Sequence, residues 1–182
     1  MRIIGGSLRG RTVMPPSGFK ARPTTDFAKE GLFNVLDNMY DLSAVRVLDL
    51  FSGTGSISYE FASRGAEEIY SVEMNPLHAS FIKRSAASFG LTGMHVVRHN
   101  VFEFLDICRI DFDIIFADPP YGLEGLDTIP DKVLGAPGAG DGLLRDGGVF
   151  ILEHPGTFSF EGHSRFQREK KYGNVHFSFF KQ

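Results

Sequence analysis

The chain has 182 residues, of which 42% are hydrophobic, and a net charge of −3. This length fits a single domain, residues 1–182, that buries roughly 70% of its unfolded surface. Its one cysteine, Cys108, excludes an internal disulfide, and no apolar run reaches the ~18 residues of a membrane span or follows Met1 as in a signal peptide. We therefore expect a cytoplasmic protein. The six histidines show no metal-ligand spacing, so no metal site is predicted.

The N-terminal region, residues 1–23, is predicted to be an arm that precedes the core, residues 24–182. Residues 2–4 and 11–13 are predicted to be short strands of a hairpin, followed by a loop at 15–18. A helix is predicted to begin near Thr25 or Asp26. Apolar residues then recur at the spacing of one helical face: Leu32, Val35, Leu36 and Met39. We expect this helix to cover a sheet.

A strand over residues 45–50 leads into a glycine-rich turn. Gly53 and Gly55 allow positive φ and the close approach of a ligand, and a helix opening near Thr54 would point its N–H groups at that ligand. Ser58 stands where the dinucleotide-binding fingerprint has its third glycine, and Asp49 precedes the turn. These two features argue against a bound pyrophosphate and for a cationic ligand.

Glu73 ends the next predicted strand, residues 68–72. An acid in this place can accept both hydroxyls of a ribose, and a solvated carboxylate at a strand end is the alternative. Asn75 and Pro76 predict the start of a helix that ends at Gly90.

Further strands are predicted at 94–98, 112–117, 148–153, 166–168 and 175–180, the last two joined by a tight turn. This alternation predicts an α/β fold. We expect a Rossmann-like arrangement: a seven-stranded, mostly parallel sheet with a C-terminal antiparallel hairpin and helices on both faces. The ligand crevice of such a sheet lies outside the carboxyl ends of its strands.

The four residues Asp118-Pro119-Pro120-Tyr121 close the apolar strand at 112–117. An exocyclic base amine becomes a better nucleophile when acceptors hold its N–H groups. Asp118 supplies carboxylate oxygens, Pro119 supplies a carbonyl without a competing N–H, and Tyr121 offers a flat face for stacking. The tetrapeptide therefore predicts a site for a flipped-out base, and an ordinary strand-ending turn is the alternative.

These motifs in this order resemble the class I methyltransferases that use S-adenosylmethionine to methylate exocyclic amines. Other segments look like the RsmD-type ribosomal RNA guanine-N2 methyltransferases. They are Arg2-Ile3-Ile4-Gly5-Gly6, Arg9-Gly10-Arg11, Arg22-Pro23-Thr24-Thr25-Asp26 with Glu30 and Leu32-Phe33, Arg64-Gly65-Ala66, and Lys171-Tyr172-Gly173. The similarity covers nearly the whole chain. It departs at Asn100, where an acid often follows the third strand, and over residues 123–142, which are rich in Gly and Pro.

The resemblance implies S-adenosylmethionine as cofactor and a guanine N2 of small-subunit (16S) ribosomal RNA as target, in free RNA or a partly assembled subunit. We also expect the protein to act as a monomer. Catalysis is assigned to Asp118, Pro119 and Tyr121. The implied cofactor-binding residues are Asp49, Phe51, Gly53, Gly55, Glu73, Met74, Asn100, Val101 and Asp118.

Basic side chains concentrate at the two ends of the chain. The net charge is +4 over residues 1–35, −10 over 36–160 and +3 over 161–182. If both ends lie together beside the Asp118 loop, they would neutralise RNA phosphates, and scattered surface charge is the alternative. The predicted RNA-binding residues are Arg9, Arg11, Arg22, Thr24, Lys170 and Lys171.

Two other functions remain open from the residues alone. An adenine-N6 methyltransferase acting on DNA or RNA would use the same tetrapeptide, because it fits either purine amine, and only the N-terminal resemblance favours guanine. A nicotinamide-dependent oxidoreductase or a non-catalytic nucleotide-binding module is the more distant alternative. The missing third glycine and the Asp118 tetrapeptide argue against both of these.

Overall fold

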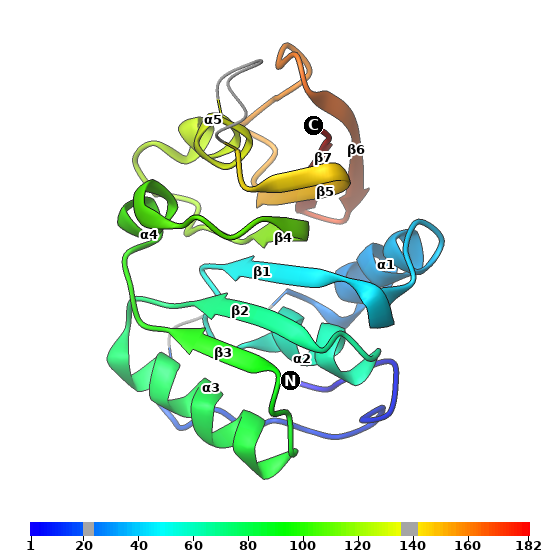
Figure 1. Ribbon diagram of the computed structural model, residues 1–182, viewed down its shortest axis with the longest axis vertical. Helices are drawn as coiled ribbons and strands as arrows, with labels where there is room; N and C mark the ends of the chain where they lie inside the picture. Colours follow the sequence, from blue (N-terminus) through cyan, green and yellow to red (C-terminus); the bar gives the residue numbers. More distant parts are fainter. Residues whose placement is uncertain (20–23, 136–141) are drawn as a thin grey trace.

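The computed structural model describes residues 1–19, 24–135 and 142–182, and these residues build one sheet in the order β3-β2-β1-β4-β5-β7-β6 (Figure 1). Strands β1 to β5 pair in parallel, and β7 runs antiparallel to both β5 and β6. The predicted mixed sheet with a C-terminal hairpin is confirmed. The strands are β1 Arg46–Leu50, β2 Glu68–Val72, β3 Met94–Val97, β4 Phe112–Ala117, β5 Leu144–His154, β6 Phe166–Tyr172 and β7 Val175–Phe180.

Most helices begin where the sequence supplies a cap. Thr25 accepts a hydrogen bond from the N–H of Ala28, and Asn75 precedes a proline at the first helical position. The helix expected near Thr54 begins two residues later, after Gly55. The helices are α1 Asp26–Asp37, α2 Ser56–Ser63, α3 Pro76–Ser88, α4 Val101–Ile107 and α5 Ile129–Leu134, with 3-10 turns at Leu42–Ala44 and Leu126–Thr128.

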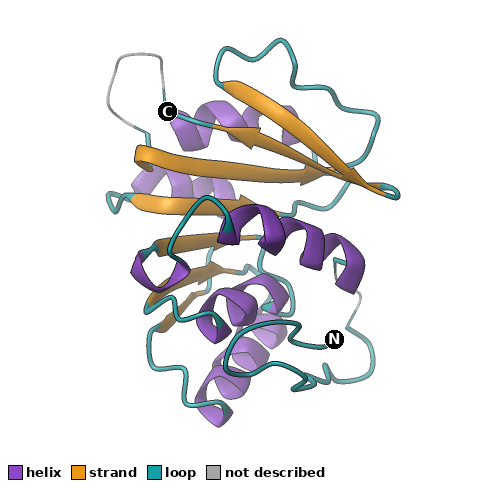
Figure 2. Cartoon of the chain, turned by 90° about the vertical axis from the view of Figure 1, so that its right-hand side faces the viewer, coloured by secondary structure: helices purple, strands orange, loops and turns teal. Residues whose placement is uncertain are grey.

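The helices cover both faces of the sheet, as predicted (Figure 2). Apolar side chains of α1 and α2 pack on one face, and those of α4 and α5 pack on the other. Residues 123–142, noted for their Gly and Pro content, include α5 in their described part. The side chains of Ile129, Val133 and Leu134 from this helix are buried in the apolar core that α4 and α5 form with the sheet.

Two strand boundaries differ from the sequence prediction, because β5 begins at Leu144 rather than at residue 148 and β6 continues to Tyr172. The predicted hairpin of the arm is present in short form: an antiparallel bridge joins Arg2 to Thr12, and the N–H of Ile3 donates to the carbonyl of Arg11 at 2.9 Å. The arm also bonds to α2, where Ser7 donates its N–H to the carbonyl of Ser63 at 2.7 Å. In both figures the N-terminal arm lies beside the helices of the β1–β3 half.

A buried ion pair fixes the arm to the helices. The Lys29 Nζ atom of α1 lies 3.1 Å from Oε1 of Glu60 in α2, and it also donates to the carbonyl of Arg2 at 2.6 Å. Glu60 accepts the backbone N–H groups of Ile4 and Gly5. Neither charged side chain is more than 1% exposed. The arm is therefore an integral part of the packing rather than a free extension.

Candidate active site

Four acidic side chains lie at the carboxyl end of the sheet, on four neighbouring strands. Asp49 lies in β1, Glu73 follows β2, Asp118 follows β4 and Glu153 lies in β5. Side chains alternate between the two faces of a strand, so all four continue the rows that pack against α1 and α2. The parallel strand order thereby gathers four carboxylates at the predicted crevice.

The turn after β1 has an uncommon backbone conformation. Phe51, Gly53 and Gly55 have φ values of 59°, 54° and 81°. A Cβ atom at Gly55 would lie 3.0 Å from the ring of Tyr59, so this position needs glycine for space as well as for φ. Among the described residues, Phe51 is the one non-glycine residue with positive φ. This conformation strains the backbone, and strained residues are concentrated at ligand-binding sites.

Asp49 lies beneath this turn. Its carboxylate is 1% exposed and accepts hydrogen bonds from the N–H of Ser58, at 3.2 Å, and from the Ser58 hydroxyl. Burial raises the pKa of Asp49 to about 7, although the bonds from Ser58 act in the opposite direction. Asp49 therefore supports the turn from below through its hydrogen bonds with Ser58.

Glu73 is buried rather than solvated, and it connects two loops. Its Oε2 accepts the N–H of Gly53 at 2.9 Å, and its Oε1 accepts the N–H of Asn75 at 2.7 Å. An ionised carboxylate has about four lone-pair sites, so two remain for other donors. The arrangement suits a ligand that presents a pair of hydroxyl groups beside the turn.

Asn100 and Met74 converge at the same edge of the sheet. The Oδ1 of Asn100 accepts the N–H groups of Phe102 and Glu103 at 2.9 and 3.3 Å, which caps α4, and its Nδ2 lies 3.8 Å from the sulfur of Met74. Met74 is exposed, and Val101 is buried in the first turn of α4. Asn100 thus acts as the N-cap of α4.

The tetrapeptide from Asp118 to Tyr121 leaves β4 beside β1, where the N–H of Asp118 lies 3.3 Å from the carbonyl of Leu50. Pro119 is buried, and Tyr121 is 44% exposed. The hydroxyl of Tyr121 lies 3.4 Å from Oε1 of Glu153. Tyr121 therefore presents part of its ring to solvent at the crevice while its hydroxyl approaches the buried acid.

Asp118 and Glu153 form a pair of neighbouring carboxyl groups. They directly follow the paired residues Ala117 and Leu152 of β4 and β5. Burial raises the pKa of Asp118 well above its usual value, and the charges of Glu153 and Asp49 add to this effect. Burial also raises the pKa of Glu153 to about 7, despite a hydrogen bond from its neighbour Thr24. Close carboxyl groups of this kind readily hold a proton between them.

Comparison with known proteins gives concordant results. The family model "Conserved hypothetical protein 95" matches residues 1–181. The Bacillus subtilis (strain 168) protein YlbH is 32% identical over 161 residues, which cover 85% of this chain and 82% of that protein. Ribosomal RNA small subunit methyltransferase D of Escherichia coli (strain K12) is 34% identical over 121 residues, which cover 66% of this chain and 60% of that enzyme. The chain belongs to the RsmD-type family. The matched region spans less than two thirds of the E. coli enzyme.

Solved structures agree with this assignment over the full length of the RsmD-type chain. The YhhF protein of E. coli superposes with a TM-score of 0.84 at 28% identity, covering 100% of this chain and 97% of that one. A protein of Thermus thermophilus gives a TM-score of 0.86 at 28% identity, covering 100% and 99%. The fold is that of the Rossmann-like class I methyltransferases, as the sequence motifs predicted.

Sequence reasoning did not assign Glu153 to the site of this RsmD-type protein. Thr24, predicted to contact RNA, is instead buried, and its hydroxyl donates to Oε2 of Glu153 at 2.9 Å. The sequence did contain a signal for Glu153, because the strand predicted at 148–153 ends in this acid, just as the strand at 68–72 is followed by Glu73. The next residue, His154, belongs to the opposite face, where it is buried and lies 2.8 Å from the hydroxyl of Ser178.

The basic ends of the RsmD-type chain meet in part, because α1 contacts β6, where the ring centroids of Phe27 and Tyr172 lie 5.7 Å apart. The N-terminal arm packs near α2, and the β6–β7 hairpin forms the far edge of the sheet (Figure 1). Arg9, Arg11, Lys170 and Lys171 are all exposed. Lys170 and Lys171 pair with residues of β7 that lie opposite Glu153 and its neighbour, so they reach the crevice end of the sheet. Arg22 lies outside the described residues.

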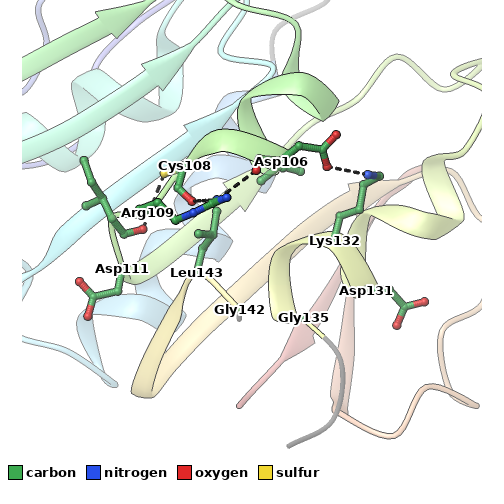
Figure 3. A pocket seen from close by; sticks show the side chains of 11 residues that line it. Asp106, Cys108, Arg109, Asp111, Asp131, Lys132, Gly135, Gly142 and Leu143 are labelled. Carbon is green, nitrogen blue, oxygen red and sulfur yellow. Dashed lines mark hydrogen bonds and ion pairs between the residues drawn. The ribbon is translucent and has the colours of Figure 1, made fainter. Parts of the chain in front are cut away.

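A pocket of about 550 Å³ lies at the opposite end of the sheet, between α4, α5 and the amino ends of β4 and β5 (Figure 3). Arg109 donates to the carbonyl of Asp106, and Lys132 pairs with the Asp106 carboxylate at 3.0 Å. Gly135 and Gly142 in its lining border residues that the structure does not describe. We assign no ligand to this pocket.

Within residues 1–19, 24–135 and 142–182, no group of three or more His, Cys, Asp or Glu side chains is placed to hold a metal ion. In the same ranges, no helix has both the length and the apolar character needed to cross a membrane.

Proposed function

We propose that this protein transfers a methyl group from S-adenosylmethionine to the exocyclic N2 amine of a guanine in small-subunit ribosomal RNA. The observation that carries the proposal is the Asp118 tetrapeptide at the carboxyl end of β4, beside a strained glycine-rich turn and Glu73. The E. coli relative carries the name of a small-subunit ribosomal RNA methyltransferase, which supports the substrate.

The residues around the turn fit this cofactor. Glu73 keeps lone pairs for two ribose hydroxyls, and the positive φ of Gly53 and Gly55 lets a ligand approach the backbone closely. The exposed thioether of Met74 and the cap of Asn100 border the same edge, where an adenine would lie. When bound, the cofactor supplies an electrophilic methyl group on a positively charged sulfur. Asp49, Asp118 and Glu153 make the crevice favourable for such a cation.

Asp118 and Pro119 orient the amine. The Asp118 carboxylate and the Pro119 carbonyl accept its two N–H groups, which directs the nitrogen lone pair at the methyl group. As the new C–N bond forms and the S–C bond breaks, the nitrogen becomes positive and then loses one proton. The Asp118 carboxylate accepts this proton and passes it to water. Correct positioning of donor and acceptor is worth on the order of 7–11 kcal/mol of the barrier.

The target base reaches the site by leaving its helix or loop, as enzymes that modify bases require. The exposed part of the Tyr121 ring provides a surface on which the base stacks. The exposed side chains of Arg9 and Arg11 in the arm, and of Lys170 and Lys171 in β6, neutralise phosphates of the bound RNA. One chain supplies the Asp118 tetrapeptide, the glycine-rich turn and Glu73, so we propose a monomer that acts on free ribosomal RNA or a partly assembled subunit in the cytoplasm.

The test uses ribosomal RNA from a strain that lacks this protein. The purified protein and methyl-labelled S-adenosylmethionine are incubated with this RNA, and the digested nucleosides are identified by mass spectrometry. We expect N2-methylguanosine at one position. Asp118→Ala should lower the rate roughly 10²–10³-fold, because an orienting acceptor is lost. Glu124→Ala is the matched control, since Glu124 is exposed in the same loop. Methyladenosine as the product, or normal turnover by Asp118→Ala, would contradict the proposal.

A further inference from the structure

Glu153 is a buried carboxylate without a cation from the described part of the chain. It is 4% exposed, and no Lys, Arg or His of the described residues forms an ion pair with it. Glu60 is also a buried carboxylate, but it forms ion pairs with two cations. Lys29 and Arg64 lie at 3.1 and 3.7 Å from its two oxygens. An uncompensated buried charge costs several kcal/mol. Within the described residues, Glu153 therefore lies in an unfavourable place, next to the tetrapeptide that we propose orients the amine.

The two oxygens of Glu153 have different surroundings. Oε2 is fixed by the hydroxyl of Thr24 at 2.9 Å. Oε1 has a long contact of 3.4 Å with the hydroxyl of Tyr121, on whose ring the base would stack. Glu153 also follows Leu152 in the strand that pairs with β4, so it lies beside Asp118. Neighbouring strands are roughly 4.8 Å apart, a spacing at which two carboxylates reach adjacent groups of one base.

We propose that Glu153 selects guanine over adenine by accepting the N1–H of the flipped base through Oε1, with Thr24 as the residue that positions it. In guanine the exocyclic amine is flanked by the N1–H donor. In adenine the amine is flanked by an N1 lone pair, which a carboxylate repels. The Asp118 tetrapeptide can hold either amine, so the residue that selects the base is Glu153 in the neighbouring strand β5. This inference rests on the proposed methyl transfer to guanine.

Two other roles for Glu153 lead to different expectations. A purely structural acid that holds the Thr24 segment would affect every substrate equally when replaced. An acid that only accepts the proton of the amine would do the same, because all amine substrates lose that proton. A residue that reads N1–H changes the ratio between substrates that differ at N1. The ratio is therefore the quantity to measure.

The experiment compares two RNA substrates, one with guanine and one with 2-aminopurine at the position that the wild-type protein methylates. 2-Aminopurine keeps the 2-amine but has a lone pair at N1. We expect the wild-type protein to prefer guanine about 10- to 100-fold in kcat/KM, the range of a good base contact. Glu153→Gln should bring this ratio close to one, because its amide can donate to the N1 lone pair. The loss of O6 in 2-aminopurine is the same for both proteins.

Thr24 gives a matched pair of variants. Thr24→Val keeps the shape but removes the hydroxyl that fixes Oε2, and it should lower the guanine preference about threefold to tenfold. Thr24→Ser restores the hydroxyl and should restore the preference. If Glu153→Gln turns over neither RNA, competition between the two RNAs for binding gives the same ratio without activity.

The outcomes separate the two proposals. A wild-type protein that does not methylate the guanine RNA contradicts the proposed function itself. A wild-type protein that methylates guanine, together with a Glu153→Gln protein that keeps the wild-type ratio in turnover or binding, overturns only the role of Glu153. A fall in both rates at constant ratio likewise overturns it.

Discussion

Replacing Glu153 by Gln should stabilise the fold at neutral and alkaline pH. The substitution keeps an oxygen that can accept the Thr24 hydroxyl, and it removes a buried charge that pairs with no cation of the described residues. Burial raises the pKa of Glu153 from 4.5 to about 7. A carboxyl group whose pKa is higher in the folded than in the unfolded protein binds more protons in the folded state between these values. The stability of the wild-type protein therefore falls as pH rises through this range.

The magnitude follows from the same values. One pH unit corresponds to about 1.4 kcal/mol, so the interval from 4.5 to 7 corresponds to about 3 kcal/mol in the free energy of unfolding. Below about pH 4.5 the group is protonated in both states and the variant should gain nothing. Above about pH 7 the full difference should be present.

Urea denaturation at several pH values between 4 and 8 measures this difference for the wild-type protein and Glu153→Gln. Glu161→Gln is the control, because Glu161 is exposed, and its difference from wild type should stay flat. The reasoning fails if the stability difference between wild type and Glu153→Gln is independent of pH. It also fails if the variant is less stable at pH 8, since that result would show a stabilising carboxylate.

Three further changes test the cofactor site, the buried ion pair and the arm. Glu73→Gln should weaken S-adenosylmethionine binding, because hydrogen bonds to a charged group contribute ~1.5–3 kcal/mol each, and an unchanged Kd in calorimetry would contradict this. Lys29→Met should lower the free energy of unfolding by about 3–5 kcal/mol, because Glu60 loses its buried partner; wild-type stability in urea would refute the pairing. Replacing Arg9 and Arg11 by Ala should reduce the salt dependence of RNA binding by about one unit of slope per lost phosphate contact. Lower thermal stability with an unaltered slope would instead assign both residues to packing.

Much of the fold follows from local signals in the sequence. The caps at Thr25 and Asn75 act within three residues of themselves, and the alternation of apolar residues defines each strand by its own neighbours. The positive φ of Gly53 and Gly55 is likewise a local requirement of the turn. For this reason the sequence alone located the strands, most helices and the Asp118 tetrapeptide at a strand end.

Only the tertiary structure decided which distant groups meet. Thr24 and Glu153 are 129 positions apart in the sequence, and they meet because α1 begins over the carboxyl end of β5. Lys29 forms its ion pair with Glu60 only when the arm, α1 and α2 pack together. Neither contact leaves a periodic or capping pattern in the sequence. Which buried polar residues pair depends on the strand order and on how the helices pack on the sheet. The partner of Asp118 in the crevice was accordingly invisible in the sequence, because β5 becomes the neighbour of β4 only when the sheet forms.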